Sequence, residues 1–229
     1  MEVGGEQFAG LERFAELLAE RSAGVPLDRA ALAIAAVLRS RDVEGTMAAL
    51  DELAAGVPEP TFEALRRHLY DELGFGGPTG EYDDPRHSML DLVVAHRRGL
   101  PILLATVMIE VGRRAGVPVV GIGMPMHFLV RSAGDPEAFV DPVTGEPFDR
   151  AGARRRFDAM TAGRMPWDDR HLAPTGSRLI VVRMLTNLRA SYERRHDPVH
   201  LALVARMRAS MVELQAEAGD AVRLSAVFN

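Results

Sequence analysis

Apolar residues recur every three to four positions through the first third of the chain, which is the period of an amphipathic helix. This spacing predicts four helices, over residues 8–18, over a stretch that Asp28 begins as N-cap, over residues 46–55 and over residues 61–73. Residues 1–73 are therefore expected to form an N-terminal helical segment. The turn-rich stretch GFGGPTG, residues 74–80, follows it.

The next polar signal is a helix start. Ser88 precedes an apolar pair and has Asp91 three residues on, which resembles a capping box in which Asp replaces the usual Glu. We expect Ser88 to cap a short helix that runs to about His96.

The centre of the chain predicts a buried helix and a small sheet. Pro101 is a favoured first helical residue, the positions after it are apolar on nearly every face up to Glu110, and Gly116 fits the end of this helix. Three short strands are expected at residues 117–122, 127–131 and 138–141, the last two as an antiparallel hairpin. The fold class is therefore α+β.

The last part of the chain returns to the helical period. Asp149 is expected to cap a polar helix through residues 154–160, and two helices follow, over residues 177–195 and from Asp197, as N-cap, to about residue 217. We expect a core at residues 74–160 and a C-terminal helical appendage at 161–229, all in one compact unit.

Composition narrows the function classes. The 229 residues carry a net charge of −5, so the sequence shows no electrostatic footprint for nucleic acid. All 27 basic residues are Arg. The chain has no Cys, which excludes a disulfide, a thiolate nucleophile and a Cys-bound metal. The longest apolar stretch has about ten residues where a membrane span needs about twenty, so we expect a cytoplasmic protein without a membrane partner.

The sharpest candidate chemistry is a His and an Asp on neighbouring strands. His127 starts one predicted strand and Asp141 ends the next, and in an antiparallel hairpin such positions are adjacent. A carboxylate that accepts from the imidazole fixes its tautomer, so the pair would supply two members of an acyl-transfer triad. The alternative is a His–Asp pair that only joins the two strands.

The third member, a nucleophile, is harder to find. The start of the buried helix would suit it, but Leu100, Pro101 and Ile102 stand there and none of them can attack a substrate. Thr106 is expected to bond to a helix carbonyl. Ser88 remains as a candidate hydroxyl, with capping as its alternative role.

Metal and cofactor chemistry find little support in the sequence. A site made by His127, Asp141 and His87 is a weak alternative, because the three have no specific ligand spacing. Residues 74–80 lack the Lys and the preceding strand of a phosphate-binding loop. We expect no cofactor and no resident metal.

Several motifs, in order, resemble the transglutaminase-like superfamily and within it the SirB-type branch, whose members often carry a tetratricopeptide-like tail. They are DPRHSML at residues 84–90, RRGLPI at 97–102, GVPV at 116–119, PMHFLVR at 125–131 and DP at 141–142. The segments LDELA at 50–54 and RMLTNL at 183–188 also fit, so the resemblance covers roughly residues 28–215.

The resemblance implies a papain-like core in which a central helix packs on a small antiparallel sheet. His127 and Asp141 match the family's His and Asp, and the Cys of active members falls near Pro101. Two positions depart from the branch: His87 stands where Asn is usual, and Met126 stands where Gly is usual and would narrow a cleft. The matching motifs make Asp84, Arg86, His87 and Phe128 candidate ligand contacts.

The leading functional hypothesis is a non-catalytic binding or regulatory module. It would hold a peptide or small-molecule ligand near His127 and offer a surface for a protein partner on the C-terminal helices. The alternative is a hydrolase or acyl transferase that uses His127 as base, Asp141 to orient it, and Ser88 or water as nucleophile. The oligomeric state is not indicated.

Overall fold

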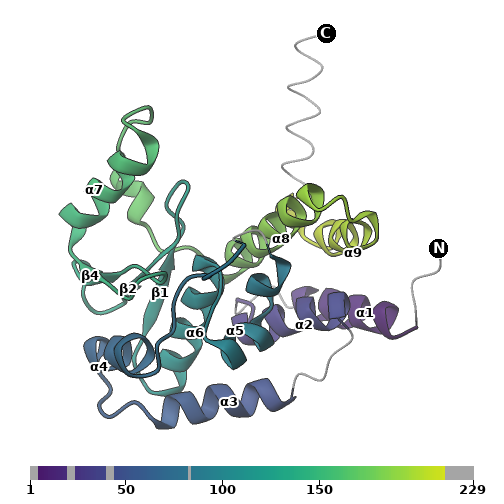
Figure 1. The fold of residues 1–229 in the computed structure, drawn as a ribbon, viewed down its shortest axis with the longest axis horizontal. Coiled ribbons are helices and arrows are strands. Elements are labelled where there is room, and N and C mark those ends of the chain that lie inside the picture. The colour runs from purple at the N-terminus through teal and green to yellow at the C-terminus, as the bar shows by residue number, and fades with distance from the viewer. Residues whose placement is uncertain (1–4, 20–23, 40–43, 82–83, 215–229) are drawn as a thin grey trace. The chain divides into compact units, whose positions relative to one another are not determined.

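The computed structural model describes residues 5–19, 24–39, 44–81 and 84–214 (Figure 1). The chain divides into two compact units, one made of residues 1–41 with 177–229 and one of residues 42–176. This division differs from the boundaries expected after residues 73 and 160. None of the described helices is long and apolar enough to cross a membrane.

The first unit is helical and joins segments from both ends of the chain. Its helices are α1 (Gly5–Ala19), α2 (Leu27–Arg39), α8 (Ser177–Arg194) and α9 (Pro198–Ala209). The Ser177 hydroxyl accepts from the Val25 N–H at 2.9 Å, and Arg178 Nη1 donates to the Leu18 carbonyl at 2.8 Å. These bonds tie the start of α8 to the N-terminal helices across more than 150 positions of sequence.

Two predicted helix starts in this unit have different outcomes. Asp197 caps α9, since its carboxylate accepts from the His200 N–H at 3.1 Å. Asp28 does not cap α2: the helix begins at Leu27, so Asp28 lies in its first turn and is 1% exposed. The helix α9 ends at Ala209 with Ser210 as its C-cap, earlier than the predicted end near residue 217.

The second unit contains a small sheet and the helices around it. In chain order the elements are α3 (Glu44–Ala55), α4 (Phe62–Arg66), the π-helical turn η1 (Arg67–Glu72), η2 (Pro85–Ser88), α5 (Leu90–His96), α6 (Pro101–Arg114), β1 (Val119–Ile122), β2 (Leu129–Ser132), β3 (Phe139–Val140), β4 (Pro147–Phe148), α7 (Arg150–Thr161) and η3 (Asp169–Leu172). The α+β class with helical termini is confirmed.

The four strands form an antiparallel meander in the order β1-β2-β3-β4. Val120 pairs with Arg131 across β1 and β2, and Val130 pairs with Val140 across β2 and β3, so the predicted hairpin is confirmed. The two-residue strand β4 was not expected, because Pro147 is a poor strand former and the pairing is very short.

The central helix α6 packs on one face of this sheet. It begins at Pro101, and Gly116 follows its C-cap with a φ of 74°, as the sequence predicts. A Cβ on Gly112 would lie 3.0 Å from the side chain of Val119, so the helix approaches β1 closely. The Thr106 hydroxyl donates to the Ile102 carbonyl at 2.8 Å, so this hydroxyl has a structural role.

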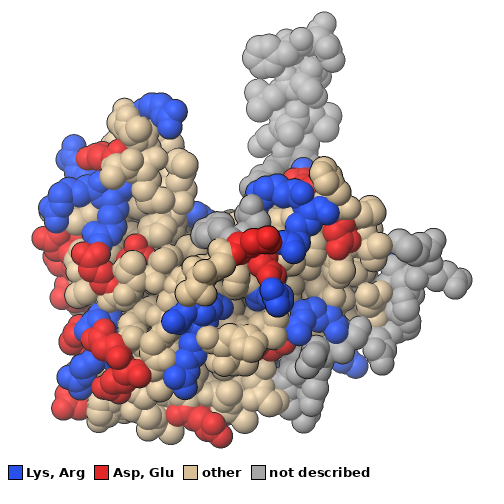
Figure 2. Space-filling model, viewed as in Figure 1, with Lys and Arg blue, Asp and Glu red and all other residues tan. Residues whose placement is uncertain are grey.

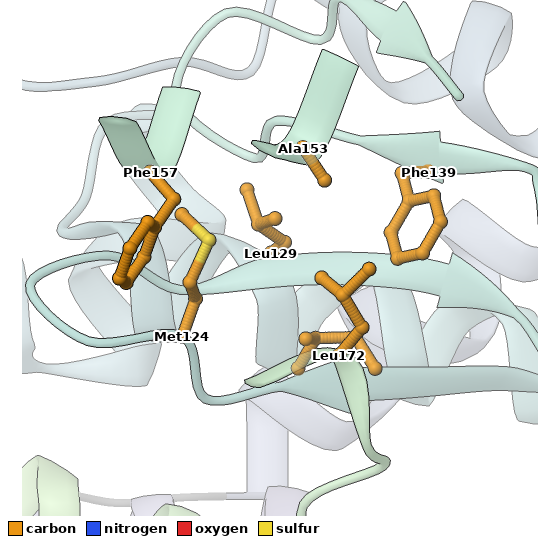
Figure 3. Packing of buried hydrophobic residues seen from close by; sticks show 7 residues of the cluster. Met124, Leu129, Phe139, Ala153, Phe157 and Leu172 are labelled. Carbon is orange, nitrogen blue, oxygen red and sulfur yellow. The ribbon is translucent and has the colours of Figure 1, made fainter. Parts of the chain in front are cut away.

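The opposite face of the sheet carries a second apolar core. Because side chains alternate along a strand, the neighbours of the α6-facing residues point to this side. The cluster draws residues from the strands, from the β1–β2 connection, from α7, which Asp149 caps, and from η3. Its members are Ile122, Met124, Leu129, Phe139, Ala153, Phe157 and Leu172, and Figure 3 labels all of them except Ile122. The sheet is therefore covered on both faces, and the site lies at one end of its strands.

Candidate functional site

His127 and Asp141 meet at the end of the β2–β3 hairpin. The register that pairs Val130 with Val140 places Leu129 opposite Asp141 and leaves His127 diagonal to it. The imidazole Nε2 lies 3.0 Å from Asp141 Oδ2. Both side chains are mostly buried, with 12% and 13% of their surfaces exposed. The juxtaposition that the strand pattern predicts is present, although His127 stands two residues before β2 begins.

The carboxylate of Asp141 is fixed by the turn that follows β3. Oδ1 accepts from the Val143 N–H at 2.9 Å, which leaves Oδ2 for the imidazole. The turn closes on itself, because the Gly145 N–H donates to the Asp141 carbonyl at 2.8 Å and the Asp141 N–H donates to the Glu146 carbonyl at 3.0 Å. Since a carboxylate only accepts, the neutral His127 ring must carry its hydrogen on Nε2.

The charge of Asp141 is stabilised despite its burial. Burial raises the pKa of the Asp141 carboxyl, but the hydrogen bond and charge of His127, the Val143 N–H and the Arg156 guanidinium together hold it below its usual value. Arg156 Nε lies 3.9 Å from Oδ2, and its guanidinium is 4.0 Å from the centroid of the Phe148 ring. Asp141 is therefore suited to orient an imidazole and unsuited to act as a proton donor.

A buried layer behind the turn, made of Arg66 and Tyr70, was not predicted from the sequence. Arg66 donates to the Gly145 carbonyl at 3.2 Å and to the carboxylates of Glu63 and Asp71. The Tyr70 ring fills the space where a Gly145 side chain would lie. Burial, and the nearby negative charge of Asp141, raise the pKa of the Tyr70 phenol, so the hydroxyl stays neutral.

The glycine run connects the same turn to the start of α6. The Gly77 N–H donates to the Val143 carbonyl at 3.0 Å, and a Cβ on Gly77 would lie 2.7 Å from the Val143 side chain. The Gly76 N–H donates to the Arg97 carbonyl at 3.0 Å, and the Gly99 N–H donates to the Gly76 carbonyl at 3.2 Å. The glycines therefore allow close backbone packing between the Asp141 turn and the residues that precede Pro101.

Few backbone donors remain at the N-terminus of α6. The Leu100 N–H donates to the His87 carbonyl at 2.9 Å, and the Leu103 N–H donates to the Leu100 carbonyl at 3.0 Å. Pro101 has no N–H to offer. Leu100 and Ile102 are buried, with 7% and 1% exposed. The helix start therefore presents hydrocarbon without a nucleophile.

Ser88 does not have the capping role that its spacing predicts. It lies in η2, α5 is capped by the residue after it, Met89, and no side chain bonds that helix start. Ser88 is 4% exposed, and its Oγ finds no hydrogen-bond partner among the described residues, His127 included. The capping prediction is wrong because the chain makes an extra 3-10 turn before the helix begins.

The candidate ligand contacts have local structural roles. The Asp84 carboxylate caps η2 and accepts from the Arg86 N–H and Nε at 2.9 and 2.8 Å. The carbonyl of His87 holds the start of α6, while its Nδ1 is buried and lacks a hydrogen-bond partner in the described part of the chain. Phe128 is 2% exposed, so its ring belongs to the core.

The alternative of a metal site gains no support from the geometry. Within residues 5–19, 24–39, 44–81 and 84–214, no three His, Asp or Glu side chains gather so that they could hold a metal ion. His127, Asp141 and His87 thus form no ligand set. On the face drawn in Figure 2, acidic and basic side chains are interspersed and neither sign forms a continuous field.

The chain has relatives among known proteins. The UPF0162 protein of Xylella fastidiosa strain 9a5c is 44% identical over 135 residues, which are 56% of this chain and 48% of that protein. The UPF0162 protein of Vibrio cholerae is 34% identical over 87 residues, 37% of this chain and 32% of that protein. F-box only protein 21 of Mus musculus is 33% identical over 69 residues, 30% of this chain and 11% of that protein.

This chain spans about half the length of the Xylella relative. No solved structure matches this chain. A family model, described as the transglutaminase-like superfamily, matches residues 21–186. This region contains the sheet, the helix α6 and the His127–Asp141 pair. Since the match covers most of its length, the chain belongs to the transglutaminase-like superfamily.

Proposed function

We propose that this chain is a non-catalytic binding or regulatory module that holds a peptide ligand beside His127. The observation that carries the proposal is the hydrocarbon at the start of α6, where Leu100, Pro101 and Ile102 stand in the position that suits a nucleophile. Acyl transfer by a thiol needs a Cys, and this chain contains none. Two predictions remain untested: that the chain belongs to the SirB-type branch, and that its C-terminal helices are tetratricopeptide-like.

The backbone at the same place supports the proposal independently. Acyl-transfer catalysis needs N–H groups aimed at the oxyanion of the tetrahedral intermediate. Pro101 cannot donate, and the N–H groups of Leu100 and Leu103 already donate to carbonyls of the chain. A helix start without nucleophile and with these donors occupied favours binding over turnover.

Several contacts nevertheless fix the geometry of the His127–Asp141 pair. Asp141 is held by its own turn, by Arg156 and by the buried layer of Arg66 and Tyr70. In the neutral dyad, Nε2 donates to the carboxylate, so Nδ1 is the hydrogen-bond acceptor of the ring. A fixed imidazole of this kind is the feature beside which we place the peptide.

A second candidate is a hydrolase in which His127 activates water. The intact pair favours it, since an oriented imidazole can act as a base toward water without a protein nucleophile. The version that uses Ser88 is less favoured, because its Oγ makes no hydrogen bond to His127.

Turnover separates the two functions. The purified chain and its His127→Ala variant are incubated with p-nitrophenyl acetate, an amide analogue and a mixture of short peptides. We expect equal, background rates from both proteins, and binding of peptides by the unmodified chain alone. Hydrolysis that disappears in a folded His127→Ala variant would overturn the proposal in favour of the hydrolase.

A further inference from the structure

Met126 combines two unfavourable features next to His127. Its φ is 62°, in the left-handed region that a residue with a long side chain rarely adopts. Its side chain is also exposed, at 66%, although it is apolar. The left-handed backbone opposes folding, and the exposed side chain gains nothing from the core to offset that cost, so we look for a functional reason for this residue.

The other left-handed residues have a simple explanation. Among the described residues, the remaining non-glycine positions with positive φ are Arg97, Ala162 and His196. Arg97 and Ala162 are the C-caps of α5 and α7, and His196 follows the end of α8. A left-handed residue is the common way to end a helix. Met126 ends no helix: it follows Pro125 in a turn that the His127 N–H closes on the Met124 carbonyl, and the third position of such a turn takes a positive φ that glycine adopts without strain and methionine does not.

The loop around Met126 is fixed from both sides. Met124 and Phe128 are buried, at 0% and 2% exposed, and the φ of Pro125 is restricted by its ring. The His127 N–H donates to the Met124 carbonyl at 3.1 Å, which closes the turn. The backbone therefore cannot relax at Met126 without moving His127 or a core side chain.

We propose that Met126 is a specificity-determining residue whose thioether packs against an apolar side chain of the bound peptide. The inference rests on the proposed function, because it takes the ligand to be held at His127. A methionine is unbranched and polarizable, so it adapts to different apolar groups. The ligand class is thus a peptide that places an apolar residue beside His127.

The test uses three variants of the full chain. Met126→Gly removes the side chain and the backbone strain, Met126→Gln keeps the length but is polar, and Met126→Leu keeps an apolar surface. Met165→Gln, at another exposed methionine with 40% exposure, is the matched control. The probes are N-acetyl tripeptide amides that differ only in a central Leu, Phe, Ser or Asp.

Binding is measured by calorimetry and stability by the unfolding midpoint. We expect the unmodified chain to bind the Leu and Phe peptides about ten-fold more tightly than the Ser and Asp peptides, as burial of one side chain allows. The preference should disappear in Met126→Gly and Met126→Gln and persist in Met126→Leu and Met165→Gln. Met126→Gly should unfold at a higher temperature while it binds more weakly.

The failures are distinguishable. If His127→Ala abolishes binding but the Met126 variants keep the preference, the inference is overturned and the proposed function stands. If Met126→Gly loses stability, the residue is structural and the inference is likewise overturned. If none of the tripeptides binds the unmodified chain, the proposed peptide-binding function fails, and the inference fails with it.

Discussion

Gly145 and Tyr70 are in such close contact that no other residue fits at position 145. A Cβ on Gly145 would lie 2.5 Å from both Cβ and Cγ of Tyr70, and the φ of Gly145 is 73°. Tyr70 belongs to the π-helical turn η1, and Gly145 closes the turn whose first residue is Asp141. This contact therefore couples an N-terminal helical segment to the geometry of the His127–Asp141 pair.

Gly145→Ala should destabilise the protein by about 2 to 4 kcal/mol, because a left-handed alanine adds to the overlap with a buried ring. Gly74→Ala is the matched control: its φ is 72°, but nothing lies within 4 Å of its Cβ position. The Gly74→Ala variant should lose about 1 kcal/mol of unfolding free energy. Urea unfolding measures both, and equal losses would show that the Tyr70 contact has no energetic weight.

Arg66→Met should destabilise the fold by about 1 to 3 kcal/mol, because it leaves the Gly145 carbonyl and two carboxylates without their donor. The adjacent Arg67→Met should change stability by less than about 0.5 kcal/mol, since exposed ion pairs contribute little. Only 11% of the Arg66 side chain is exposed, against 53% for Arg67. A similar, small effect of both changes in urea unfolding would contradict the buried role of Arg66.

Ser88→Ala should be neutral or stabilise the fold by up to about 1 kcal/mol, because it removes a buried hydroxyl that lacks a partner among the described residues. Asp149→Ala, at a cap that does bond the Gly152 N–H at 2.7 Å, should lose about 1 kcal/mol. Chemical denaturation compares the two. A loss for Ser88→Ala as large as that for Asp149→Ala would restore the capping interpretation.

Stability should depend on the Asp141 charge at acidic pH. The folded-state pKa of Asp141 lies below its unfolded value, so its contribution is complete above the unfolded value of about 3.9 and is lost as the pH falls through the folded one. Asp141→Asn should therefore be less stable than the unmodified chain at pH 7, and the difference should shrink below about pH 4. Urea unfolding from pH 7 to pH 3 measures it, and a constant difference would refute the linkage.

Local sequence signals predicted much of the fold and part of the site. The caps at Asp149 and Asp197, the helix that begins at Pro101 and the meeting of His127 with Asp141 all follow from short-range spacing. These signals work because a cap or a tight hairpin is decided within a few residues.

What the sequence could not reveal depends on distant contacts. Arg66 and Gly145 are 79 positions apart, and the union of α1 and α2 with α8 and α9 spans most of the chain. Ser88 shows a local limit, since the extra turn of η2 moves the N-cap of α5 by one residue, from the predicted Ser88 to Met89. An unpaired buried hydroxyl has no signature in a sequence.

The central claim is that the imidazole of His127 is oriented toward the start of α6, where this chain has Pro101 and no nucleophile. Pro101→Cys tests it most directly, by the rate at which iodoacetamide alkylates the single thiol between pH 5 and pH 9. The account predicts that the thiol reacts faster at neutral pH in Pro101→Cys than in Pro101→Cys combined with His127→Ala, since a nearby imidazole favours the thiolate. Identical rate profiles in two folded proteins would show that the pair does not serve this position, and would contradict the account.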